Sequence, residues 1–136
     1  MKNQILALAA ATLAISAAAS IPAYAAKQTA AEKGEAKLAK LLEGRVAGKP
    51  VNCISAYNSS DMQVIDQTAI VYKQGGTLYV ARPTDPKSLR KNDILVTRRT
   101  GSQICVNDSM RMVDQNGGFL TSVVFLDKFV PYEKEG

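Results

Sequence analysis

The spacing of apolar residues divides the chain into a helical part and a part made of strands. From Lys27 to Gly44 the chain is rich in Ala, Lys, Glu and Leu, and leucines recur at helical spacing at Leu38, Leu41 and Leu42. This pattern predicts one amphipathic helix. Thr29 and Glu32 form a capping box for its first turn, and Gly44 is the expected C-cap.

After Pro50 the pattern changes to short runs of β-branched and aromatic residues separated by turn residues, which is typical of antiparallel strands. The expected strands are Val51 to Ser55, Val64 to Asp66, Thr68 to Tyr72, Thr77 to Arg82, Asp93 to Arg99, Ser109 to Asp114 and Phe119 to Leu126. The unbroken run Ile94 to Val96 predicts a strand that is buried on both faces. An apolar group around Pro131 is expected to close one end of the core.

Two hairpins follow from the turn residues. Gly75 and Gly76 lie between the third and fourth of these strands, and Asn116 with Gly117 lies between the last two. Glycine tolerates the positive φ angles that tight hairpin turns require. We therefore expect positive φ at Gly75, Gly76 and Gly117.

These elements predict a mainly β (α+β) fold, with a small antiparallel barrel or curled sheet of about six to seven strands. One N-terminal amphipathic helix lies over an opening or a face. The expected organisation is a signal peptide over residues 1–25, the helix and a linker over 26–50, and a β-domain over 51–136 that forms the folding unit.

The N-terminus predicts export. An apolar run from Ile5 to Ala19 is followed by Pro22 and by the A-x-A pattern Ala23-Tyr24-Ala25, after which signal peptidase cuts. The run is shorter than the roughly 20 strongly apolar residues of a permanent anchor. We expect a periplasmic or secreted protein, cleaved after Ala25 and without a stable membrane anchor.

The chain has two cysteines, Cys53 and Cys105. In an oxidising compartment an even number of cysteines predicts a disulfide. Closing a loop of this length stabilises a small domain by about 4 kcal/mol in the chain-entropy model. The two residues are too far apart in sequence for the C-x-x-C motif of redox catalysts, so the bond is expected to be structural.

Composition excludes much of known hydrolase chemistry. The chain has no histidine, which removes histidine triads, Cys-His dyads and histidine-ligated zinc sites. No cofactor and no metal site are expected. The remaining catalytic possibility is a pair of carboxylates drawn from Asp61, Asp66, Asp93, Asp108 and Asp114. Aspartates in turns more often bind their own backbone, so no catalytic residue is assigned.

A second candidate site is basic. Arg82, Lys87, Arg90 and Lys91 lie in or beside one loop, and Arg98-Arg99 ends the next strand. Adjacent strand residues point to opposite faces, so only one of these two arginines, Arg98, is expected to join the others. The anion-binding candidates are thus Arg82, Lys87, Arg90, Lys91 and Arg98, with a solvated basic face as the alternative.

Four stretches, Arg45 to Ile54, Asp93 to Arg98, Gly101 to Cys105 and Phe129 to Tyr132, resemble an uncharacterised family of small exported bacterial proteins with two cysteines. The resemblance spans most of the chain after the signal. It implies one domain with a disulfide, and no activity, cofactor or site residue.

Three functions remain open. The leading hypothesis is a non-enzymatic exported binding or accessory protein, for example an inhibitor of an envelope-directed hydrolase. The alternatives are a binder of anionic envelope polymers and a hydrolase that uses carboxylates alone. The expected partner is an envelope protein or an anionic envelope polymer. Nucleic acid is not expected, because the protein is exported and has few aromatic residues for stacking.

The export and disulfide predictions are tested together by intact mass. Protein recovered from the periplasm should begin at Ala26 and weigh two hydrogens less than the all-thiol chain. A retained signal, or two thiols that react with an alkylating reagent, would contradict them.

Overall fold

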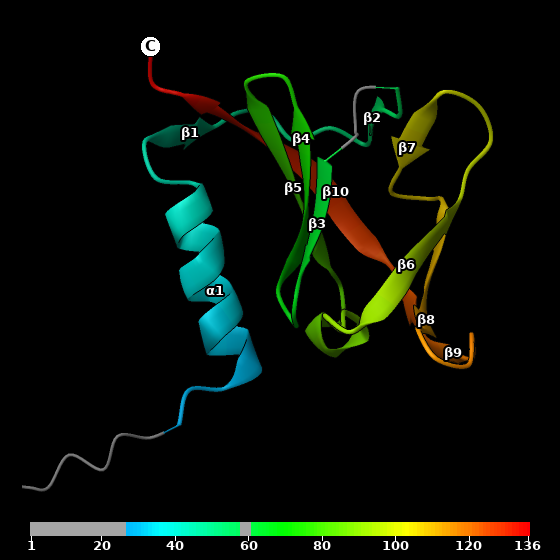
Figure 1. The fold of residues 1–136 in the computed structure, drawn as a ribbon. Coiled ribbons are helices and arrows are strands. Elements are labelled where there is room, and N and C mark those ends of the chain that lie inside the picture. Colours follow the sequence, from blue (N-terminus) through cyan, green and yellow to red (C-terminus); the bar gives the residue numbers. More distant parts are fainter. Residues whose placement is uncertain (1–26, 58–60) are drawn as a thin grey trace, which may run out of the picture.

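The computed structural model describes residues 27–57 and 61–136. These ranges contain one α-helix, ten strands and one 3-10 helix, and Figure 1 shows their arrangement. In chain order they are α1 (Ala30–Leu41), β1 (Arg45–Ala47), β2 (Cys53–Ser55), β3 (Asp61–Ile65), β4 (Ala69–Gln74), β5 (Thr77–Pro83), η1 (Pro86–Ser88), β6 (Asp93–Arg98), β7 (Gln103–Cys105), β8 (Ser109–Asp114), β9 (Leu120–Val124) and β10 (Leu126–Lys134).

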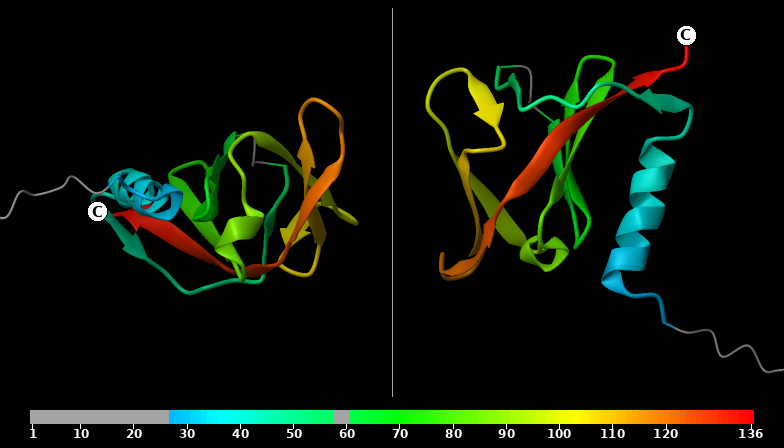
Figure 2. Two further views of the ribbon diagram at one scale, coloured as in Figure 1. Left: turned by 90° about the horizontal axis from the view of Figure 1, so that it is seen from below. Right: turned by 180° about the vertical axis from the view of Figure 1, so that it is seen from behind.

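The strands form three antiparallel sheets, and the elements stack in three layers. The largest sheet has the order β1-β10-β5-β4-β3, and the two smaller ones are β2-β7 and β6-β8-β9. Figure 2 shows α1 on one side of the five-stranded sheet and β6, β8 and β9 on the other. The five-stranded sheet is thus the middle layer.

Alternation along β4 explains why this sheet is covered on both faces. Ala69 and Val71 belong to the apolar cluster that includes Leu38 of the helix. Ile70 and Tyr72 belong to the cluster shared with the two smaller sheets. All four β4 residues are at most 4% exposed, because successive side chains of a strand leave it on opposite faces.

The helix begins and packs as its sequence dictates. Thr29 Oγ1 accepts from the Glu32 amide at 3.2 Å and Glu32 accepts from the Thr29 amide at 2.8 Å, which confirms the capping box. Gly34 is buried, and a Cβ placed on it would overlap the Thr68 hydroxyl and lie 2.7 Å from the Asp66 carbonyl oxygen. The missing side chain therefore allows the helix to approach the β3–β4 turn closely.

The fold prediction is confirmed in its coarse form and wrong in detail. The mainly β fold, the single N-terminal helix and the disulfide are present. Within the described residues, however, the strands form three sheets and no closed barrel, and ten strands replace the six or seven expected. Segment 26–50, predicted to be a helix and linker, also contains β1, which pairs with β10.

The longest strand, β10, was predicted only as an apolar patch around Pro131. Proline lacks the N–H that would donate a hydrogen bond to a neighbouring strand. At Pro131 this missing donor disrupts no ladder, because the nitrogen faces the end of a neighbouring strand. The N and O of one residue in an antiparallel strand point to the same side, and the Pro131 carbonyl accepts from Gly48 at 2.7 Å. Its nitrogen therefore faces the end of β1, where Ala47 pairs with Tyr132 and the ladder stops.

Both predicted hairpins form, with a different use of glycine in each. Gly75 has φ +57° in the β4–β5 turn as expected, whereas Gly76 is not among the positive-φ residues. In the β8–β9 turn the positive angle, +69°, belongs to Gly118 and not to Gly117. The longer loop moves the left-handed position one residue along the chain, and Gly117 instead lies against the Phe119 ring.

The strand from Ile94 to Val96 is not buried on both faces as predicted. Ile94 is 50% exposed, because β6 belongs to an outer sheet with only one face on the core. The run that is buried on both sides is Ala69 to Tyr72 in the middle sheet. Apolar content alone does not distinguish an outer strand from a central one.

Cys53 and Cys105 form the predicted disulfide. They are direct partners in the β2-β7 ladder, so the bond joins a sheet of two short strands that is marginal without further support. The predicted signal peptide, residues 1–25, lies outside the described residues. No helix in the described part of the chain is long and apolar enough to cross a bilayer.

The close approach at Gly34 gives a stability prediction. Gly34→Ala should destabilise the protein by about 2 kcal/mol through overpacking, although alanine favours a helix by about 1 kcal/mol. Urea unfolding measures this change. Gly76→Ala is the control, because no atom lies within 4 Å of its added Cβ, and it should change stability by less than about 0.5 kcal/mol. A stabilised Gly34→Ala protein would contradict the contact.

Candidate functional site

The five predicted anion-binding residues do not converge on one surface. Arg82 lies on β5 and its guanidinium binds Glu35 of the helix through two contacts, at 2.6 and 3.1 Å. The hydrogen bond from Arg82 lowers the pKa of Glu35, and the same bond raises the pKa of Arg82. Arg82 is therefore already paired and serves to hold the helix on the sheet.

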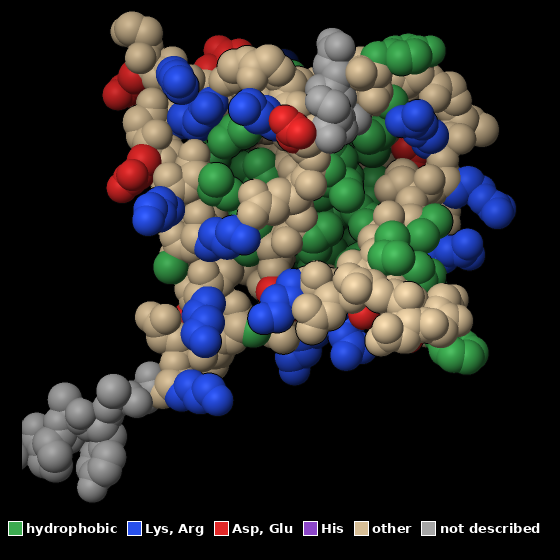
Figure 3. All heavy atoms as spheres, in the orientation of Figure 1, with side chains coloured by type: hydrophobic (Ala, Val, Ile, Leu, Met, Phe, Trp, Pro, Cys, Tyr) green, Lys and Arg blue, Asp and Glu red, His purple; other side chains and the backbone are tan. Residues whose placement is uncertain are grey.

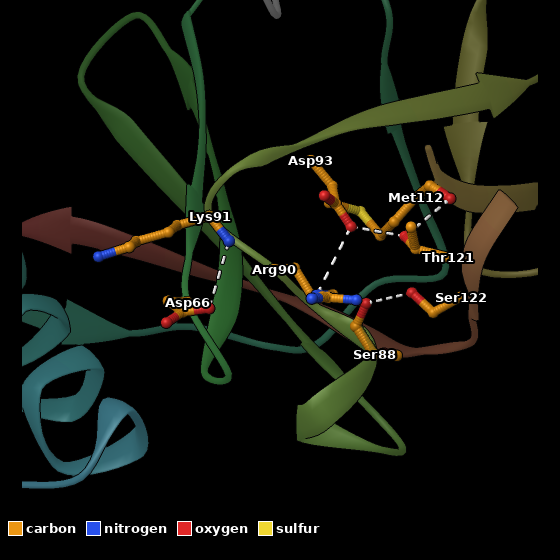
Figure 4. Close-up of polar contacts among 8 residues, drawn as sticks. All are labelled: Asp66, Ser88, Arg90, Lys91, Asp93, Met112, Thr121 and Ser122. Carbon is orange, nitrogen blue, oxygen red and sulfur yellow. Dashed lines mark hydrogen bonds and ion pairs between the residues drawn. The ribbon is translucent and has the colours of Figure 1, made fainter. Parts of the chain in front are cut away.

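Arg90 and Lys91 are adjacent in sequence, but Figure 4 shows their side chains pointing in different directions. The Arg90 Nε lies 3.7 Å from Asp93 Oδ2, and the Asp93 side chain is 8% exposed. The Thr121 hydroxyl donates to the same Asp93 oxygen at 2.5 Å. This group joins the β6 start to β9, and the nearby bond from Ser122 Oγ to the Ser88 carbonyl joins β9 to η1.

Lys91 belongs to a separate cluster of lysines near the helix. Its amide donates to Asp66 Oδ1 at 3.2 Å, and it lines a cavity of about 380 Å³ together with three further lysines, Lys27, Lys33 and Lys37. Asp66 also lines this cavity. Lys87 is exposed on η1, where its amide is bound by the Asp85 carboxylate at 3.1 Å.

Arg98 lies at the far end of β6, in a second cavity of about 390 Å³. The lining consists of Val96, Thr97, Arg98, Arg99, Ser109 and Arg111. We call this the arginine pocket. Three guanidinium groups share it, and no acidic residue is among the described residues that line it.

The ladder explains how the arginine pocket forms. Val96 pairs with Arg111 and Arg98 pairs with Ser109, and directly paired residues point to the same face of a sheet. This is the outer face, because the intervening Met110 and Met112 of β8 are buried. Arg99 lies beyond the end of β6, so strand alternation does not apply to it and both Arg98 and Arg99 reach the pocket, contrary to expectation.

Arg111 was not predicted as a site residue. The alternation Met110, Arg111, Met112 in the sequence already indicates that the arginine leaves β8 on the solvent side. What the sequence did not supply was the register that sets it beside Val96 of β6.

Four of the five candidate carboxylates, those of Asp66, Asp93, Asp108 and Asp114, are bound by backbone or neighbouring groups. Asp108 Oδ2 accepts from the Cys105 amide at 2.8 Å, and Asp114 Oδ2 accepts from the Gly117 amide at 2.9 Å. Asp93 and Asp114 are direct partners in the β6-β8 ladder, the one pair among the five that this register brings together. Asp66 Oδ1 accepts from the Lys91 amide, and Asp61 is the register partner of Lys73 in the β3-β4 ladder.

Other titratable groups give no further site. Burial, with a smaller effect from Asp108, raises the pKa of the Tyr72 hydroxyl. The Tyr72 ring lies in the core edge-on to the Phe129 ring, with 5.8 Å between the ring centroids. Within the described ranges no group of three His, Cys, Asp or Glu residues is placed to hold a metal ion. The arginine pocket differs from the lysine cavity in that three arginines share a lining with no acidic residue among the described residues.

Comparison with models of protein families, with curated proteins and with solved structures finds no match to this chain. The resemblance to a family of exported two-cysteine proteins therefore stays a prediction. The function has to be argued from the geometry.

The Glu35–Arg82 pair predicts a pH dependence. The folded pKa of Glu35 lies below its ordinary value of 4.5, so the pair contributes stability above that value and loses it as the pH falls through the folded pKa. Both side chains are about half exposed, which limits the contribution to less than about 1 kcal/mol.

The wild type should be more stable than Glu35→Gln at pH 7, and the difference should shrink at a pH below 4.5 as the Glu35 carboxylate is protonated. Urea unfolding at both pH values measures this, with Glu43→Gln, which removes an exposed carboxylate just after the helix, as the control. A difference that grows on acidification would contradict the pairing.

Proposed function

We propose that this protein is a non-enzymatic exported binding module whose ligand is anionic and binds in the arginine pocket. The observation that carries the proposal is the convergence of Arg98, Arg99 and Arg111 on one cavity without a lining carboxylate among the described residues. Elsewhere the candidate cations have acidic neighbours, as Arg82 has Glu35 and Arg90 has Asp93.

The chemistry of the pocket supports a phosphate- or carboxylate-bearing ligand. Guanidinium groups present a planar fork of donors that matches both anions and stays charged at every physiological pH. The Ser109 residue in the lining adds a hydroxyl that can donate or accept. The volume of about 390 Å³ is at the lower end of the range for small-molecule sites, which suits one repeat unit of an anionic envelope polymer.

The proposal places the protein in an oxidising compartment outside the cytoplasm. The disulfide between Cys53 and Cys105 is stable where thiols are oxidised, which fits the predicted signal peptide. The net charge of +5 over the whole chain favours encounter with anionic partners.

The other two functions receive less support. A carboxylate-only hydrolase requires two free acidic groups facing one substrate, and the paired Asp93 and Asp114 are each bound by protein donors, Thr121 and Gly117. An inhibitor of an envelope hydrolase requires apolar or aromatic anchors on a rigid surface. Such side chains occur beside the arginine pocket, so a protein partner is a competing outcome of the binding experiments.

The proposal predicts a difference between two variants of equal charge. The triple variant Arg98→Gln, Arg99→Gln, Arg111→Gln should bind inorganic polyphosphate about tenfold or more weakly than the wild type, because it loses its charge-assisted contacts. The control Lys27→Gln, Lys33→Gln, Lys37→Gln removes the same charge from the helix region and should lose less than about threefold.

Titration calorimetry at low salt and at about 0.5 M NaCl measures both affinities, and wild-type binding should weaken at the higher salt. Equal losses in the two variants would show that binding depends on net charge alone. No loss in the arginine variant would remove the pocket as the site.

A further inference from the structure

Exposed apolar side chains gather on and beside β9. Phe119 is 74% exposed, Leu120 61%, Val123 47% and Phe125 66%. Single exposed apolar residues are normal on a protein surface, but a contiguous group marks a surface that binds something. These four residues lie within seven consecutive positions of the chain.

The ladder places two of these residues, Leu120 and Val123, on the same face as the arginine pocket, and Phe119 and Phe125 flank them in the chain. In the first row across the sheet, Ile94 of β6 pairs with Val113 of β8, which pairs with Leu120 of β9. In the second row, Val96 pairs with Arg111, which pairs with Val123. In the third row, Arg98 pairs with Ser109.

The outer face of the β6-β8-β9 sheet therefore changes from apolar to cationic along its strands. The first row is entirely apolar, the second has one arginine between two valines, and the third is polar. Phe125 follows the end of β9 and is exposed, between Val124 and Leu126, which are 2% and 8% exposed. Figure 3 shows hydrophobic and basic side chains close together over the β6 side of the molecule.

We propose that this outer face docks on an anionic lipid surface. The aromatic and aliphatic side chains of Phe119, Leu120 and Phe125 enter the interfacial region, and the three arginines of the pocket contact lipid phosphates. The inference rests on the proposed function, because the same arginines supply the anionic contacts. It adds the apolar half of the face and names the source of the anion.

Charge selects this occupant over a second copy of the chain. In a two-fold dimer built on this face the same patch would meet itself, which would bring like-charged arginines together without the opposing acidic groups that an isologous contact needs. A membrane surface meets both halves at once, because aromatic rings lie at the headgroup level and arginines bind anionic headgroups.

The test uses the processed protein, confirmed by mass to lack the apolar run from Ile5 to Ala19. Co-sedimentation is measured with vesicles of phosphatidylcholine and with vesicles that contain about 30% phosphatidylglycerol. Wild-type protein should partition onto the anionic vesicles at least about tenfold more strongly than onto the neutral ones. Phe119→Ser with Phe125→Ser should reduce that partitioning about tenfold, while the affinity for polyphosphate stays unchanged.

The matched control is Tyr57→Ser, which removes an aromatic ring that is 83% exposed and lies outside this sheet. It should leave vesicle binding unchanged. The arginine triple variant should lose both vesicle and polyphosphate binding. Circular dichroism and the thermal midpoint check that each variant is folded, and Phe125→Ser alone is the fallback if the double variant is not.

The outcomes separate this inference from the proposed function. Arginine-dependent binding of polyphosphate without vesicle binding would overturn the lipid proposal and leave the binding module in place. Wild-type protein that binds neither polyphosphate nor vesicles would overturn both the lipid proposal and the proposed function. Concentration-dependent dimers that Phe119→Ser with Phe125→Ser abolishes would show that a second copy covers the face, which would also overturn the lipid proposal.

Discussion

In β4, successive side chains leave the strand on opposite sides, and each side meets a different layer. Ala69 and Val71 face the helix, where Leu38 is 2% exposed, and Ile70 and Tyr72 face the two smaller sheets. Burying four such side chains contributes several kcal/mol, and neither layer can be removed without exposing one of the two sets. The helix approaches closely enough to cover its side only because Gly34 has no side chain against Thr68.

Because the two smaller sheets cover the middle sheet, each of them must present an apolar face to it. They need one apolar face each, which Ile54, Ile104, Met110, Met112 and Val124 supply. Their other faces do not pack on the core.

The β2-β7 sheet has only three residues in each strand, and the Cys53–Cys105 bond joins its strands directly. The β6-β8-β9 sheet is longer and depends on polar links at its lower end, from Thr121 to Asp93 and from Ser122 to η1 (Figure 4). Its unconstrained outer face is where binding residues can accumulate without a cost to folding.

Local signals predicted the local elements, and non-local pairing limited the rest. The capping box at Thr29, the turn at Gly75 and the disulfide depend on short motifs or on cysteine parity, and all three are confirmed. The sequence did not predict β1 or β10, because Pro131 argues against a strand unless its neighbour is known to end beside it. The five predicted anion-binding residues, Arg82, Lys87, Arg90, Lys91 and Arg98, do not come together, also because their contacts are non-local. The sequence around Arg82 does not indicate that this residue forms an ion pair with Glu35, which lies far away in the chain on the helix.

Register decides which charges act together, and this has a consequence for how the molecule meets a flat anionic surface. A shift of one residue between β6 and β8 would remove the pairing of Val96 with Arg111 that builds the outer face.

The lysines around Lys33 lie on the helix side of the five-stranded sheet, whereas the arginine pocket lies on the side of β6 and β8 (Figures 1 and 2). A flat surface can contact one of these regions at a time. Both attract anions at a distance, but only the arginine side offers apolar side chains that gain free energy on leaving water. In the proposed membrane docking, the lysines would add to the encounter rate, and the arginine face would determine the bound orientation.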